Sequence, residues 1–94
     1  MKNYHVTYTF PSKEARENFL REVTVPADIS RKEQGCLQYE YYYPAGSDTK
    51  LLLLEQWETA ADQELHTKQP HFALIGKLKE KYGAVTEVKT WESM

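Results

Sequence analysis

The sequence predicts an α+β domain, in which an antiparallel four-stranded sheet carries its helices on one face. Three observations support this fold class. Apolar residues alternate with polar ones near both ends of the chain, at 4–10 and 85–91, as half-buried strands require. Two more β-forming segments, 36–43 and 50–57, flank a turn rich in proline and glycine and so predict a hairpin. Segments with helical spacing of apolar residues stand before and after this hairpin.

The first part of the chain is expected to be a strand followed by a helix. Residues 4–10 end at a Pro-Ser pair, and Ser12 is a suitable N-cap for the helix that follows. Apolar residues then recur at helical spacing. Pro26 lacks a backbone donor and crowds the preceding turn, so we expect it to divide this helix. A second short helical piece, about 27–33, would then end at Gly35.

The second part of the chain is expected to contain the hairpin, a broken helix and a final strand. The hairpin strands are 36–43 and 50–57, and the helical region covers about 60–82 with an interruption near Pro70. The last strand is 85–91. The resulting order, β-α-β-β-α-β, is the ferredoxin-like arrangement, with an antiparallel sheet and helices on one face.

Four consecutive leucines at 51–54 interrupt the usual alternation of the third strand. A strand without polar alternation is typical of a position that is buried on both faces. The third strand is central in this topology, but the helices cover only one face of the sheet. We therefore predict a homodimer in which two sheets pack face to face.

Size and composition exclude several classes of protein. The 94 residues make one domain, 1–94. The net charge of -2 offers no basic footprint for nucleic acid. The single cysteine, Cys36, fits a reducing compartment. No leader opens the sequence and no apolar run is long enough for a membrane span, so we expect a cytoplasmic protein without a membrane partner.

A candidate site follows the third strand. Glu55 and Trp57 lie two apart on the strand and therefore share a face. His66 and His71 would diverge on an unbroken helix, but Pro70 allows both to face one cavity. A buried carboxylate is costly unless it is paired. We therefore expect one of the two histidines to pair with Glu55.

These side chains have both functional and purely structural interpretations. Either histidine can serve as a general base or proton donor, with Glu55 as acceptor or relay and Trp57 as a pocket wall. Alternatively, Trp57 belongs to the core and the Pro-His pair forms a structural corner. Two histidines and Glu55 also resemble a metal-binding set, but they lack a rigid pair four residues apart, so no metal site is predicted.

Three motifs carry a resemblance to a known family. They are Glu-Gln-Gly-Cys at 33–36, Glu-Gln-Trp-Glu at 55–58, and His66 followed by Pro-His-Phe at 70–72. With the topology, they resemble the antibiotic biosynthesis monooxygenase domain over essentially the whole chain. The subgroups that look closest are the small quinol monooxygenases and the autoinducer-2 degrading isomerases. Members of this family are dimeric α/β-barrel proteins, which agrees with the predicted homodimer.

The resemblance implies a monooxygenase that needs no cofactor and oxidises a small electron-rich aromatic, a quinol or an anthrone-like polyphenol, with O2. The residues expected to act are, for catalysis, His66, His71 and Glu55, and, for holding the substrate, Trp57, Tyr41 and Phe72.

Other interpretations stay open. One is an isomerase of a small phosphorylated hydroxyketone, for which Lys68 is the nearest cation. Another is a dimeric ligand-binding protein without catalysis. Haem degradation is disfavoured, because Ile75 or Gly76 stands where the haem-ligating histidine would fall. The lysines of the last helix, at 77, 79 and 81, are interpreted as a solvated face.

Overall fold

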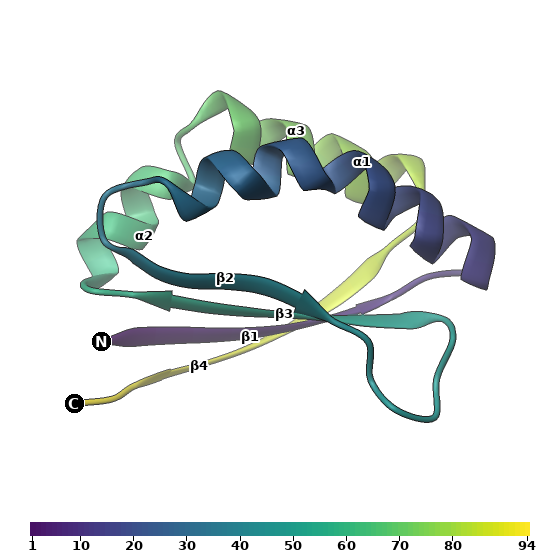
Figure 1. The fold of residues 1–94 in the computed structure, drawn as a ribbon, viewed down its shortest axis with the longest axis horizontal. Coiled ribbons are helices and arrows are strands. Elements are labelled where there is room, and N and C mark those ends of the chain that lie inside the picture. The colour runs from purple at the N-terminus through teal and green to yellow at the C-terminus, as the bar shows by residue number, and fades with distance from the viewer.

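A computed structural model describes all 94 residues and shows a sheet covered on one face by helices (Figure 1). The elements are β1 (Lys2–Thr9), α1 (Lys13–Arg31), β2 (Cys36–Tyr42), β3 (Lys50–Trp57), α2 (Ala60–His66), α3 (Pro70–Lys81) and β4 (Val85–Glu92). The strands are antiparallel neighbours in the order β2-β3-β1-β4, so β3 is central. The predicted ferredoxin-like fold is therefore confirmed.

Helix α1 differs from the prediction because it continues through Pro26. It begins as expected, with the Ser12 hydroxyl accepting the Ala15 N–H at 3.0 Å. Proline removes only one backbone hydrogen bond from a helix, and the fully buried Pro26 ring gains packing in return. The expected division of this helix is therefore wrong.

The helical region after β3 is broken where the sequence indicated. Helix α2 ends at His66, and Pro70 occupies the first turn of α3. Proline fits this position because its fixed φ suits a helix start and the first N–H groups have no partner within the helix. The break leaves His66 and His71 on two separate helices.

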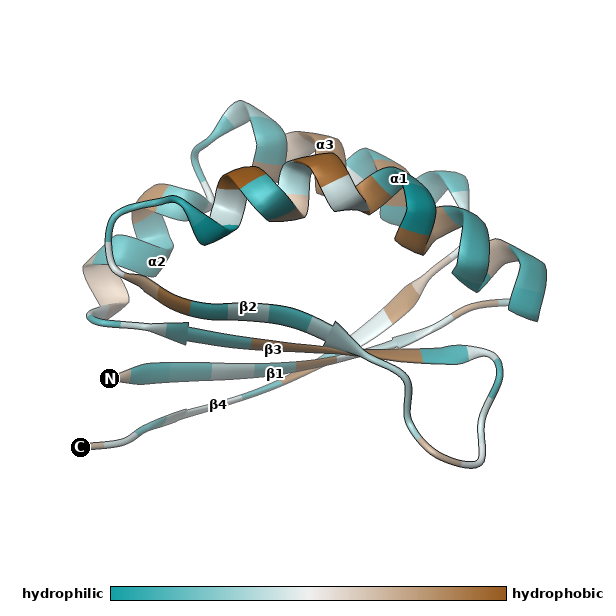
Figure 2. Cartoon of the chain, in the orientation of Figure 1, coloured by the Kyte–Doolittle hydropathy of each residue, from teal (hydrophilic) through white to brown (hydrophobic).

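The core lies between the sheet and the helices. Phe19 of α1 packs against Tyr8 of β1 and against Phe10, the residue that follows this strand, with ring centroids 5.2 Å apart in both pairs. Figure 2 shows hydrophobic residues along α1 and on the strands that it covers. Burial of each such side chain contributes roughly 1.5–3 kcal/mol, so this layer holds the helices against the sheet.

The outer face of the sheet has no helix over it (Figure 1). Leu51 and Leu53 are buried beneath the helices, whereas Leu52 and Leu54 point the other way and are only partly covered. On this outer face the His5 Nε2 atom is enclosed but has no hydrogen-bond partner. Burial on both faces of the third strand is thus not achieved by one chain.

None of the three helices has the length and apolar character needed to cross a membrane.

Candidate active site

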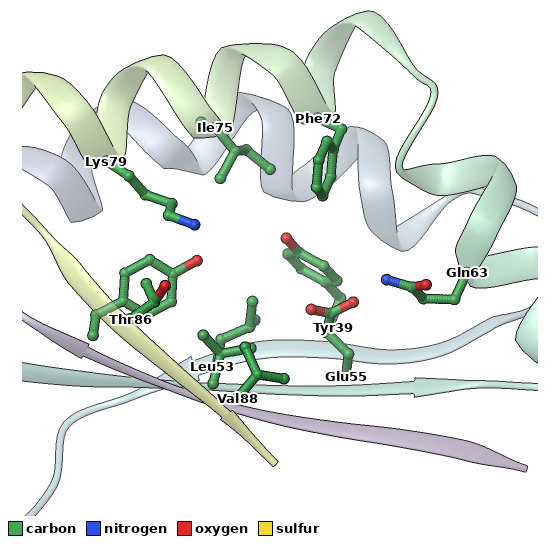
Figure 3. A pocket seen from close by; sticks show the side chains of 12 residues that line it. Tyr39, Leu53, Glu55, Gln63, Phe72, Ile75, Lys79, Thr86 and Val88 are labelled. Carbon is green, nitrogen blue, oxygen red and sulfur yellow. The ribbon is translucent and has the colours of Figure 1, made fainter. Parts of the chain in front are cut away.

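A cavity of about 200 Å³ lies between the sheet and α3 (Figure 3). All four strands contribute to it, together with α2 and α3. Its walls are mostly apolar, and its polar or ionisable lining side chains are Tyr8, Tyr39, Glu55, Gln63, Lys79 and Thr86. A small apolar cavity with a few convergent polar groups is the usual form of a small-molecule site.

Glu55 supplies the carboxyl group of this cavity. It projects from the central strand β3 toward the helices and is only 8% exposed. Burial raises the pKa of Glu55 to about 7, a hydrogen bond from Trp57 opposes the rise, and the charge of Glu33 adds to it. A carboxyl group with a pKa near neutrality can both accept and release a proton, as general acid–base catalysis requires.

Trp57 holds Glu55 in place. As predicted, the two side chains share one face of β3, and the indole Nε1–H donates to Glu55 Oε1 at 2.9 Å. Trp57 is 0% exposed and is not among the side chains that line the cavity. Of the two positions considered for Trp57, pocket wall and core, the indole therefore occupies the core. From there it orients the carboxyl group of Glu55.

The two histidines pair with a different carboxylate. Glu33 Oε2 accepts from His66 Nδ1 at 2.5 Å and from His71 Nε2 at 2.9 Å. The expected pairing of Glu55 with a histidine is therefore wrong. The indole of Trp57 already occupies Glu55, and the turn after α1 brings Glu33 to the junction of α2 and α3. The sequence offered only one hint of this role, the position of Glu33 in the motif at 33–36.

The Glu33–His66–His71 cluster also has the composition and spacing of a metal-binding set. Its ligand atoms lie within 4.8 Å of one another, and two imidazoles with one carboxylate suit zinc or iron. Glu33 replaces the Glu55 considered from the sequence. Because one carboxylate oxygen already accepts from both rings, an ion would have to displace both hydrogen bonds.

The cluster stands behind the cavity wall. The His66 ring is 1% exposed and lies edge-on to Tyr39 and Phe72, with centroids 5.6 and 5.2 Å away. Both of these neighbours line the cavity, but neither histidine does. Burial lowers the pKa of His66, and the Glu33 carboxylate offsets part of this effect.

The side chains predicted to bind the substrate do not all line the cavity. Phe72 lines the cavity as expected. Tyr41 does not, because it packs in the core against Tyr8 and Phe19, with centroids 5.9 and 6.2 Å away. Of the three side chains proposed to hold a ring, only Phe72 faces the cavity.

Lys79 is one of the cavity residues that sequence reasoning missed, with Tyr8, Tyr39, Gln63 and Thr86. Its interpretation as part of a solvated face is wrong, because it lines the cavity, whereas Lys77 and Lys81 are exposed. Helical spacing was the available signal. Positions 72, 75 and 79 recur at intervals of three and four residues and therefore share one face of α3.

Comparisons with known proteins agree with this fold. Residues 4–77 match the family model described as antibiotic biosynthesis monooxygenase. The chain is 33% identical over 76 residues to "Putative monooxygenase YcnE" of Bacillus subtilis, covering 80% of each chain.

Two solved structures show how closely the fold is shared. The protein described as "Putative antibiotic biosynthesis monooxygenase from Nitrosomonas europaea" has a TM-score of 0.90 at 16% identity, covering 100% of this chain and 99% of that one. SnoaB of Streptomyces nogalater, described as a cofactor-independent oxygenase, has a TM-score of 0.78 at 10% identity, covering 99% and 92%. At these identities the likeness concerns the fold.

The raised pKa of Glu55 predicts a specific loss of stability with pH. The folded-state value of about 7 lies above the ordinary 4.5 of an unfolded chain, so the folded state binds the proton more tightly. The contribution of Glu55 to the free energy of unfolding is therefore highest below about pH 4.5. It falls by about 3 kcal/mol in total as the pH rises through about 7. Glu55→Gln should remove this dependence.

Urea unfolding of the wild type and of Glu55→Gln, at about pH 5 and about pH 8, measures the effect. The difference between the two proteins should change by about 2.5 kcal/mol in favour of the variant at the higher pH, because a small part of the loss has already occurred at pH 5. Parallel pH dependence of the two proteins would show that Glu55 ionises normally.

Proposed function

The chain belongs to the antibiotic biosynthesis monooxygenase family, and from this premise we propose that it is an enzyme, a cofactor-independent monooxygenase. Its proposed substrate is a small electron-rich aromatic, a quinol or an anthrone-like polyphenol, which it oxidises with O2. The observation that carries the proposal is a carboxyl group with a pKa of about 7 in a mostly apolar cavity. The names of similar proteins support the same chemistry.

The reaction begins with a proton transfer to Glu55. Loss of an acidic proton, from C–H in an anthrone or from a phenolic O–H in a quinol, leaves an anion with carbanion character at a ring carbon, and this anion passes one electron to O2. The resulting superoxide and substrate radical combine to a peroxide anion, and Glu55 returns its proton to give a hydroperoxide. The hydrogen that remains on the oxygenated carbon then leaves with hydroxide as water. A ring CH2 group and O2 thus give a carbonyl and water, and a quinol correspondingly gives a hydroxyquinone and water.

The cavity supplies neutral donors for the anions of this sequence. Tyr8 and Tyr39 line it, and burial raises the pKa of both phenols far above the neutral range. They therefore keep their protons and can donate hydrogen bonds to a developing oxygen anion. Preorganised donors in a site that excludes water stabilise such charge more strongly than water does.

His66 and His71 are positioning residues in this proposal. Glu33 fixes both rings, and His66 packs against Trp57, with centroids 4.9 Å apart, as well as against two cavity side chains. The cluster would thereby keep the cavity wall, and the indole that orients Glu55, in one arrangement.

We also propose that a second copy of the chain covers the outer face of the sheet. Leu52 and Leu54 point to this face and are half-buried. Trp91 of β4, 48% exposed, shares it. The enclosed but unpaired His5 Nε2 on the same face could gain a donor or acceptor from the partner. A homodimer would give these side chains the cover that the helices cannot.

A second candidate is isomerisation of a phosphorylated hydroxyketone, with proton transfer by a cavity residue. Lys79 favours it, because a cation lines the cavity. Lys68, the cation considered from the sequence, lies outside the cavity, is largely exposed and faces Glu64 at 4.0 Å. The apolar walls favour the aromatic substrate over this small polar one.

The assignment of Glu55 as base predicts a large effect on turnover. Glu55→Gln should lower kcat/KM for a reactive quinol about 10²- to 10⁴-fold, because an amide cannot accept the proton. In the wild type, kcat/KM should rise with pH and reach half its maximum near the pKa of about 7. An oxygen electrode, corrected for autoxidation, measures both. Glu58→Gln, at an exposed position three residues on, should retain the wild-type rate and profile. Wild-type turnover by Glu55→Gln would exclude this carboxyl group as the base.

The dimer proposal predicts a wild-type mass in solution of twice the 11.0 kDa of the chain. Leu54→Glu should give monomers, because a charge cannot be buried unpaired in the interface. Light scattering after size-exclusion chromatography measures the mass. Val25→Glu alters a 66% exposed position on α1 and should leave the dimer intact. A monomeric wild type at micromolar concentration would contradict the proposal.

A thermal-shift comparison separates the two candidate reactions. The monooxygenase predicts that unreactive aromatic analogues raise Tm, whereas inorganic phosphate does not, since ligands stabilise a fold by binding its native state. A phosphate-dependent rise without any aromatic effect would favour the isomerase.

A further inference from the structure

Lys79 brings an uncompensated positive charge to the cavity. It is partly buried, lines the cavity, and lies 5.9 Å from the centroid of the Tyr8 ring. No carboxylate lies within ion-pair distance of its ammonium group, whereas Lys81 of the same helix faces Glu22 at 3.2 Å. A partly desolvated ammonium without a counter-ion is a natural partner for an anionic ligand group.

The Lys79 ammonium group and the Glu55 carboxyl group lie apart in the cavity. Figure 3 shows Lys79 at one end of the cavity, and Glu55 at the other, beside Tyr39 and Gln63. The pKa of Glu55 is raised by burial and by Glu33, with no lysine among the groups that lower it. The two ionisable groups therefore do not neutralise each other, and each is available to a bound molecule.

We propose that the Lys79 end of the cavity is a subsite for a carboxylate, so that the substrate is an aromatic acid rather than a neutral aromatic. This inference rests on the proposed function for the aromatic character of the substrate. The volume of about 200 Å³ lies below the roughly 300 Å³ at which pockets for drug-sized ligands begin. Within the proposed substrate class, that size favours a quinol of one or two fused rings over a three-ring anthrone.

The subsite would also set the orientation of the substrate. A carboxylate is attracted to Lys79, and this attraction is stronger in a partly desolvated cavity than in water. The same carboxylate would be repelled by Glu55 once that group has lost its proton. Anchoring at Lys79 therefore directs the opposite edge of the ring toward Glu55, past the apolar side chains of Phe72 and Ile75.

Two unreactive probes of nearly equal shape test the subsite by isothermal titration calorimetry. We expect the wild type to bind 2-naphthoate at least about tenfold more tightly than the neutral 2-naphthamide. The preference should shrink between about 50 mM and about 500 mM NaCl, because salt screens the attraction. Lys79→Met should abolish the preference and Lys79→Arg should retain it. Lys77→Met, which removes the same charge from an exposed site on α3, should bind both probes like the wild type.

Equal affinity of the wild type for both probes, binding of neither, or an unchanged preference in Lys79→Met would overturn the subsite. Circular dichroism of each variant verifies that the fold is intact. Neither probe reacts with oxygen, so the outcome is separable from that of the proposed function. A Lys79-dependent preference together with no oxygen uptake on any quinol would keep the subsite and reject the monooxygenase.

Discussion

The burial of the Glu55 carboxyl group beside Trp57 is the constraint on which the site depends. Glu55 lies on the central strand beneath the helices, where a single indole N–H at 2.9 Å provides its hydrogen bond within the protein. One neutral donor cannot stabilise a carboxylate as well as bulk water does. The group therefore holds its proton up to about pH 7. An acid that exchanges its proton near neutrality is what an oxidation begun by deprotonation needs.

The second ionisable cluster has a different physical role. Glu33 joins His66 and His71 at the point where the helical region breaks, and the pair of hydrogen bonds holds that break to the turn between α1 and β2. The cluster contacts the site through aromatic rings, and the charge of Glu33 also raises the pKa of Glu55. The Glu33 carboxyl group thus has two hydrogen-bond partners and a structural role. The Glu55 carboxyl group has one partner and is available for proton exchange.

The sequence predicted the fold well because its signals are local. Alternation located β1 and β4, β-forming residues on either side of a turn located β2 and β3, and Pro70 located the break between α2 and α3. The prediction that Pro26 divides the first helix was wrong, because the effect of a proline depends on tertiary packing, which cannot be inferred from the spacing of apolar residues. The site was only partly predictable for the same reason. The shared face of Glu55 and Trp57 follows from strand geometry, but which carboxylate meets the histidines depends on where the turn after α1 lies in space.

The ionisation of Glu55 is the property on which the proposed chemistry depends most. A ¹³C NMR titration of the glutamate side-chain carboxyl carbons, with the Glu55 signal assigned by its absence in Glu55→Gln, reports this pKa. The expected midpoint for Glu55 is about 7, well separated from those of exposed glutamates. A midpoint near the ordinary value of 4.5 would show that the cavity holds a permanent carboxylate, and would contradict the assignment of Glu55 as the proton-exchanging group.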